Sequence, residues 1–131
     1  MAMKNHKDLE VWKEAVELSV ACYEVTKKFP QGEQFVLASQ MRRAAISVAS
    51  NIAEGAARAG SKEFAQFLYV SLGSASELDT QIEIAKRTGL GALPDLESLQ
   101  LRSNMISRML QGLIRSVKSK NPKIKSPITN D

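Results

Sequence analysis

Residues 39–55 carry a polar line of side chains beside an apolar one, and this pairing constrains the fold more than any other feature. The apolar line recurs every three or four residues, as on one face of an α-helix. It consists of Leu37, Met41, Ala44, Val48 and Ile52. The polar line has the same spacing and consists of Gln40, Arg43, Ser47, Asn51 and Glu54. An unpaired buried polar group costs about 1–3 kcal/mol, so both lines of this helix need partners.

Four segments show this three-four alternation, and none alternates with the period of a strand. We expect helices over about residues 8–28, 33–58, 61–88 and 94–119, because Pro30, Gly60, Gly89 and Pro94 mark the breaks. The short connectors favour an all-α fold, an up-down-up-down antiparallel four-helix bundle with a single domain. Residues 1–119 are assigned to the bundle, and residues 120–131 to a basic tail that we expect to be extended or mobile.

The other three helices each have their own apolar seam. On the first helix it consists of Val11, Ala15, Leu18, Cys22 and Val25. On the third helix it consists of Phe64, Leu68, Ser71, Ala75, Leu78, Ile82 and Ala85. On the fourth helix it consists of Leu96, Leu99, Ser103, Ile106, Leu110, Leu113 and Val117. These seams predict helices that pack at shallow angles around one core.

A tight turn at Gly60 sets which residues of the second and third helices face each other, because facing numbers then add up to about 120. Arg43 is then level with Glu77, and Ser47 lies opposite Gly73 and Ser74. We expect a charge-assisted Arg43–Glu77 contact, or one from Arg42 if the register differs by one residue. The polar residues are assigned to a structural network or a subunit interface: Gln40, Arg43, Ser47, Asn51, Glu54 and Glu77.

Small residues in the middle of helices suggest close approaches of backbones. Gly73 and Gly112 each cost about 1 kcal/mol of helix propensity relative to Ala, so we expect neighbouring helices to pack tightly against them. Glu54 lies near the end of its helix and has a local alternative, an ion pair with Arg58 four residues later.

Catalysis is the alternative interpretation of the polar residues, since paired carboxylates with an Arg and an Asn can support acid–base chemistry. Such an enzyme would need an open pocket lined by Asn51, Glu54 and Glu77. We favour the structural interpretation, because polar residues at bundle seams often fix register. With one histidine, His6, and one cysteine, Cys22, the sequence contains no ligand set for a metal, and we expect no enzyme, no metal and no cofactor.

The net charge of +4 is confined to the C-terminal region, where residues 95–131 hold seven Lys or Arg and three Asp or Glu. This excess predicts a nucleic-acid interface, and the alternative is a role in solubility and at a helix C-terminus. The candidate residues are Arg108, Arg115, Lys118, Lys120, Lys123 and Lys125. With few aromatic residues for stacking, we expect weak, salt-sensitive contacts to phosphates. No apolar run is long enough to cross a membrane, and the lone cysteine fits a cytoplasmic location.

Five separated runs resemble the four-helix-bundle proteins first noticed in intervening sequences of bacterial 23S rRNA genes. The most specific is residues 39–55, Ser-Gln-Met-Arg-Arg-Ala-Ala-Ile-Ser-Val-Ala-Ser-Asn-Ile-Ala-Glu-Gly. The others are residues 9–12, residues 29–33, residues 61–64 and residues 73–78. The likeness extends over about residues 8–117.

The resemblance implies a ring-like homopentamer. The family is also similar to the accessory variability protein of diversity-generating retroelements, which binds nucleic acid and a reverse transcriptase. We therefore expect a non-catalytic oligomeric scaffold whose partners are copies of itself, RNA or DNA, and a reverse transcriptase or another protein. A protein-interaction adaptor is the alternative function.

Overall fold

The computed structural model describes residues 5–120, which form four long helices and no strand. The α-helices are α1 (Glu10–Thr26), α2 (Leu37–Ala56), α3 (Ser61–Thr88) and α4 (Leu93–Lys120). Two short 3-10 helices, η1 (His6–Asp8) and η2 (Gln31–Glu33), precede α1 and α2. The predicted all-α four-helix bundle is confirmed. The expected tail lies outside the described residues from residue 121 onwards.

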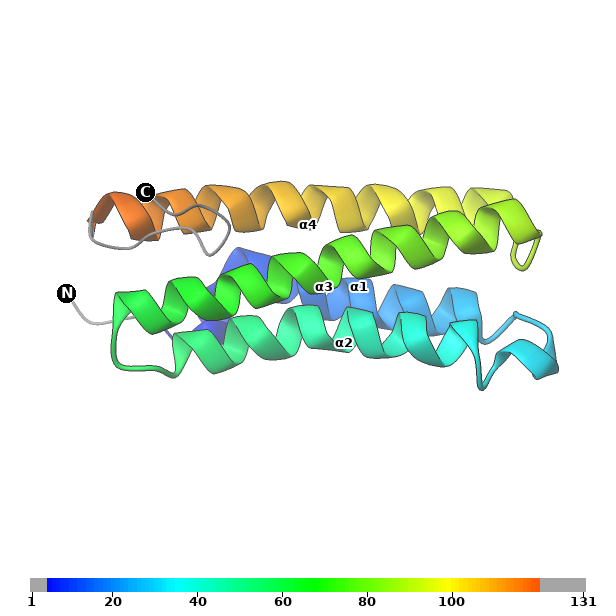
Figure 1. Cartoon of the computed structure of the whole chain (residues 1–131), viewed down its shortest axis with the longest axis horizontal. Helices are drawn as coiled ribbons and strands as arrows, with labels where there is room; N and C mark the ends of the chain where they lie inside the picture. The colour runs from blue at the N-terminus through cyan, green and yellow to red at the C-terminus, as the bar shows by residue number, and fades with distance from the viewer. Residues whose placement is uncertain (1–4, 121–131) are drawn as a thin grey trace.

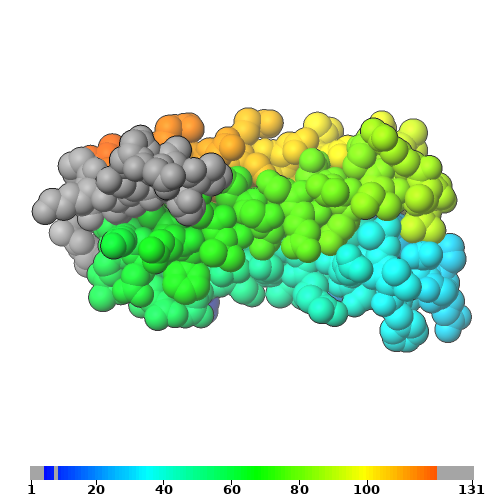
Figure 2. Space-filling view, viewed as in Figure 1, coloured from blue at the N-terminus to red at the C-terminus, as the bar shows by residue number. Residues whose placement is uncertain are grey.

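Each helix packs against two neighbours, so the four helices occupy the corners of a square. Consecutive helices pack together, and α1 also packs on α4. Within residues 5–120 the diagonal pairs, α1 with α3 and α2 with α4, bring no two Cα atoms within 8 Å of each other. Figure 1 shows the α1–α2 and α3–α4 connections at one end of the bundle and the α2–α3 connection at the other. Side chains of α2, α3 and α4 cover one long side of the molecule (Figure 2).

The predicted seams form the core. Every residue expected on the apolar lines of α2 and α3 is buried. On α1 and α4 two expected core residues, Val25 and Leu113, are only half-buried, and Thr26 and Ile114 are buried in their place. Val25 and Thr26 lie on either side of Cys22 around the helix, as Leu113 and Ile114 do around Leu110, so the same broad face of each helix points inward. Full burial of a Leu or Ile side chain contributes about 1.5–3 kcal/mol, so these seams hold the bundle together.

The helix ends differ from the sequence expectation mainly at the start of α2. The expected start near residue 33 is wrong, because residues 31–33 form η2 and α2 begins at Leu37. Gln34 Nε2 donates to the carbonyls of Thr26 (2.9 Å) and Phe29 (3.0 Å), which ties this connection to the end of α1. At the same end of the bundle, α3 ends at Thr88 and is capped by Gly89, whose φ of 71° lies in the left-handed region that favours glycine.

Gly73 and Gly112 were expected to let neighbouring helices of the same chain pack tightly against them, and this expectation is wrong. A Cβ on Gly73 would meet nothing within 4 Å, and one on Gly112 would meet only the Arg115 Nη2 atom at 3.8 Å. The close approach occurs instead at Gly55, where an added Cβ would lie 2.7 Å from Phe67 Cβ. Gly55 therefore lets the end of α2 pack against the first turns of α3.

Candidate functional site

Two serines lock the register between α2 and α3, as the facing rule predicts. The Ser47 and Ser74 hydroxyl oxygens lie 2.7 Å apart. Asn51 Nδ2 donates to the Ser47 carbonyl (2.8 Å) and to Ser47 Oγ (2.9 Å), and Ser71 Oγ donates to the Val48 carbonyl at 2.8 Å. The middle of the polar line is thus a satisfied network between two helices.

The charged members of the polar line are not buried. The expected polar network between α2 and α3 of one chain therefore does not include them. Gln40, Arg43 and Glu77 are exposed, and they line an open hollow of about 400 Å³ together with Ala44 and Ser47. Among the described residues no ion pair joins Arg43 to Glu77, although both line the same hollow. Long charged side chains keep their heads in water while their stems lie along the helix, which explains the outcome.

Arg43→Ala is expected to leave the free energy of unfolding within about 0.5 kcal/mol of that of the parent chain. The physical reason is that the guanidinium is solvated and holds no buried carboxylate. Urea denaturation measures this difference directly. A loss of several kcal/mol would show that Arg43 pairs with Glu77 in solution.

Glu54 forms the ion pair with Arg58 that its position near the end of α2 suggests. Arg58 Nη2 lies 2.8 Å from Glu54 Oε2, and both side chains are exposed. The hollow beside Glu77 contains neither Asn51 nor Glu54. These three residues therefore do not line one open pocket of the kind that the catalytic interpretation requires.

Arg42, named from the sequence only as a substitute for Arg43, makes the more extensive contacts. Its Nε donates to Thr26 Oγ1 (2.8 Å), and its Nη2 donates to Gln34 Oε1 (2.9 Å). The guanidinium carbon lies 5.0 Å from the centre of the Tyr23 ring. Arg42 therefore joins α1, the α1–α2 connection and α2. The adjacent arginines Arg42 and Arg43 indicated from the sequence that one of them would make contacts between helices. The sequence did not show which of the two faces α1.

Cys22 is a core residue rather than a nucleophile. Its side chain is fully buried in α1, and burial raises the pKa of the thiol from 9.0 to about 12, against a smaller lowering by the Arg42 guanidinium. Since the thiolate is the reactive form, the Cys22 side chain is unreactive near neutral pH.

The raised pKa of Cys22 predicts a loss of stability at alkaline pH. Below pH 9 the thiol is protonated in both states, so its contribution to stability is fully present. Above pH 9 the unfolded chain ionises at Cys22, while the folded chain stays protonated up to about pH 12. Relative to Cys22→Ala, the parent chain should lose about 1.4 kcal/mol of unfolding free energy between pH 8 and pH 10. Urea denaturation of both proteins at the two pH values measures this; an unchanged difference would contradict the prediction.

The outer face of α4 carries exposed arginines. Arg102, Arg108 and Arg115 are exposed, and none of them takes part in an ion pair within residues 5–120. Arg108 and Arg115 lie two turns apart on one face of the helix, which separates their Cα atoms by about 10 Å. The guanidinium groups are therefore available to an acidic partner.

The remaining basic candidates divide into three cases. Lys120 is exposed at the end of α4. Lys118 is half-buried, and its Nζ donates to Tyr69 Oη on α3 at 3.3 Å, so it turns toward α3 rather than outward. Lys123 and Lys125 lie outside the described residues. The described part of the expected interface thus consists of Arg108 and Arg115 on one face of α4 and of Lys120 at the end of the helix.

Residues 5–120 also lack two features that would bear on function, a metal-binding cluster and a membrane-spanning helix. No group of three or more His, Cys, Asp and Glu side chains in this part of the chain could hold a metal ion. No described helix combines the length and the hydropathy that a bilayer crossing requires.

The bundle is similar to a solved structure from Bacteroides thetaiotaomicron VPI-5482, described as a protein with unknown function from the S23 ribosomal protein family. The two chains share 24% sequence identity with a TM-score of 0.75, over 80% of this chain and 98% of the other. This likeness shows the fold. No curated protein is significantly similar to the chain. The family model for the 23S rRNA-intervening sequence protein matches residues 7–112, from η1 to the last turns of α4. The match includes the locked α2–α3 seam and Arg42, so the chain belongs to the 23S rRNA-intervening sequence protein family.

Proposed function

We propose that this chain is a homo-oligomeric scaffold that binds nucleic acid through the C-terminal half of α4. The observation that carries the proposal is a set of exposed cations on α4, Arg108 and Arg115 on one face and Lys120 at the helix end, which make no ion pair among the described residues. Exposed cations without carboxylate partners are the groups that neutralise phosphates.

The chemistry of this face favours contacts to the phosphate backbone. Its cations are carried on one rigid helix, and an arginine fork can hold a phosphate with two hydrogen bonds. On α3, the Tyr69 ring already contacts Lys118, which leaves it poorly placed to stack on a base. Binding should therefore depend on salt and discriminate little between sequences.

Self-association would place several copies of the cationic residues of α4 on one particle and so raise the affinity for nucleic acid. Five copies, the number that the family resemblance implies, would present five such faces, and linked sites raise avidity without new contacts. Gln40, Arg43 and Glu77 support this part of the proposal, because they surround an open hollow and leave a cation and a carboxylate for another copy to engage. The hollow is thus our candidate for one of the contacts between subunits.

The test is a salt titration of binding to a fluorescent single-stranded RNA, followed by anisotropy. Arg115→Ala combined with Lys120→Ala removes two exposed cations from α4. We expect weaker binding and a log–log salt slope that is smaller by about 1.4, since each phosphate contact to a single strand contributes about 0.7.

A matched control removes the same charge from α1. Lys13→Ala with Lys27→Ala takes away two exposed lysines that already pair with Glu10 and Glu24, at 3.4 Å and 3.0 Å. This variant should bind like the parent chain. Equal losses in the two double variants would reduce the effect to net charge, and no binding of the parent chain at low salt would contradict the proposal.

A further inference from the structure

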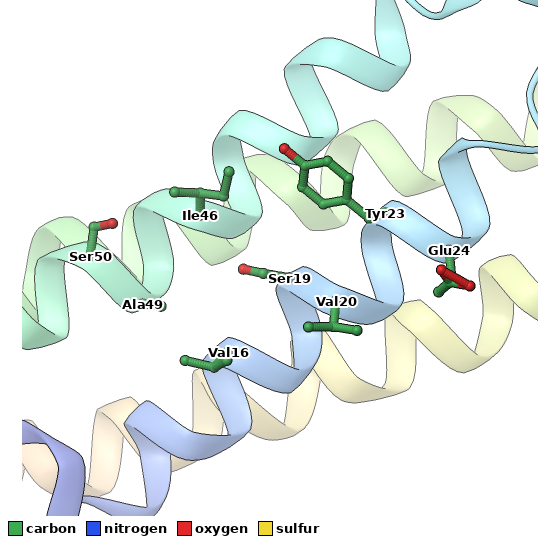
Figure 3. A pocket seen from close by; sticks show the side chains of 8 residues that line it. All are labelled: Val16, Ser19, Val20, Tyr23, Glu24, Ile46, Ala49 and Ser50. Atoms are coloured by element: carbon green, nitrogen blue, oxygen red, sulfur yellow. The ribbon is translucent and has the colours of Figure 1, made fainter.

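An apolar groove runs along the outer side of the α1–α2 pair. Its walls come from Val16, Val20 and Tyr23 on α1 and from Ile46 and Ala49 on α2, and its volume is about 330 Å³ (Figure 3). The groove is open to solvent, because the Val20 side chain is 54% exposed and the Ile46 side chain is 43% exposed. Water therefore covers apolar walls that another surface could bury.

One buried polar atom in this groove has no partner. Ser19 Oγ is inaccessible to solvent and makes no hydrogen bond within residues 5–120. Figure 3 shows its hydroxyl pointing into the gap between the two helices. Because water does not reach this atom, only a movement of the groove walls would give it a partner.

A ridge on α4 offers the complementary shape. Leu101 is 70% exposed, more than any other large apolar side chain on a described helix, and Met105 follows one turn later. Asn104 lies exposed between them and makes no side-chain hydrogen bond among the described residues. We call Leu101, Asn104 and Met105 the α4 ridge. Two apolar side chains one turn apart are the usual anchors of a helix in a groove.

The charges around the groove and the ridge are opposite in sign. Val20 has carboxylates on both sides along α1, Glu17 three residues before it and Glu24 four residues after it. Met105 has guanidinium groups on both sides along α4, Arg102 and Arg108, each three residues away. The two pairs span similar lengths of helix, about 10 Å each. A ridge seated in the groove would therefore place Arg102 and Arg108 beside Glu17 and Glu24. Glu24 already pairs with Lys27 at 3.0 Å and would share its carboxylate with the incoming arginine.

From these observations we infer that the α4 ridge of one copy docks into the α1–α2 groove of a second copy of this chain. The inference rests on the self-association in the proposed function and names a second contact, in addition to the hollow of Gln40, Arg43 and Glu77. Each copy carries one ridge and one groove on different helices, so the contact is heterologous, and it forms a ring where the rotation between copies closes. Arg108 then serves the contact between copies, while Arg115 and Lys120 lie beyond the ridge along α4 and stay available for nucleic acid.

Three single variants of the full chain test the contact by light scattering and sedimentation equilibrium. Leu101→Glu places a carboxylate on the ridge, facing an acidic groove, and Val20→Glu places one inside the groove. Each should weaken self-association at least tenfold. The control is Phe35→Glu, which adds the same charge at a side chain that is 87% exposed and outside both surfaces. This variant should associate like the parent chain, and circular dichroism should show all three folded.

Mixing gives a stricter test. Leu101→Glu keeps an intact groove and Val20→Glu keeps an intact ridge, so an equimolar mixture should form a one-to-one pair while each protein alone does not. Unchanged assembly of Leu101→Glu, or no pair in the mixture, would overturn the inference and leave the proposed scaffold intact. A parent chain that is monomeric at all concentrations would overturn both.

Discussion

Arg42→Ala is expected to lower the free energy of unfolding by about 2–4 kcal/mol, the largest effect of any single side chain outside the apolar core. The substitution removes two charge-assisted hydrogen bonds, to Thr26 Oγ1 (2.8 Å) and to Gln34 Oε1 (2.9 Å). Thr26 is fully buried, so its hydroxyl keeps only the bond that it donates to the Cys22 carbonyl at 2.7 Å. The contact with the Tyr23 ring is lost as well.

The adjacent arginine supplies the control. Arg43→Ala removes the same side chain one residue later, where it is exposed and unpaired among the described residues. Urea denaturation of the two variants should therefore separate them by at least about 2 kcal/mol. Equal stabilities would show that Arg42 does not tie α1 to α2.

Gly55→Ala is expected to destabilise the bundle by about 1–3 kcal/mol, although alanine is the better helix former. The added methyl group would lie 2.7 Å from Phe67 Cβ and 3.2 Å from the Phe64 carbonyl oxygen. Neither atom is the far end of a flexible side chain, so the end of α2 or the start of α3 must move. Thermal or urea denaturation measures the cost.

Gly73→Ala is the same chemical change in open space. An added Cβ there meets nothing within 4 Å, so the gain in helix propensity, about 1 kcal/mol, should appear in full. The two substitutions should thus have opposite signs. A stabilising Gly55→Ala would contradict the close packing of α2 on α3.

The periodic features of this fold were predictable from the sequence. The apolar lines of α2 and α3 are buried as expected, because burying a long line of apolar side chains at helical spacing is what stabilises a bundle. The register was predictable as well, since one short turn at Gly60 sets the levels of two long helices. The Ser47–Ser74 hydrogen bond confirms it at 2.7 Å.

The direction of individual polar side chains was not predictable. Arg42 and Arg43 differ by 100° around the helix, and only the position of α1 decides which one meets partners and which one meets water. The start of α2 depends on Gln34, whose hydrogen bonds to the end of α1 exist only in the folded chain. Gly55 carries no local signal, because its role depends on the Phe64 and Phe67 side chains of another helix.

The central claim, an assembly of copies that binds nucleic acid, is tested most directly by one sedimentation velocity experiment with labelled single-stranded RNA. At low salt we expect a species several times the 14.4 kDa mass of one chain, with the RNA in the same boundary. High salt should release the RNA and leave the assembly. A 14.4 kDa monomer with RNA sedimenting alone at low salt would contradict the account.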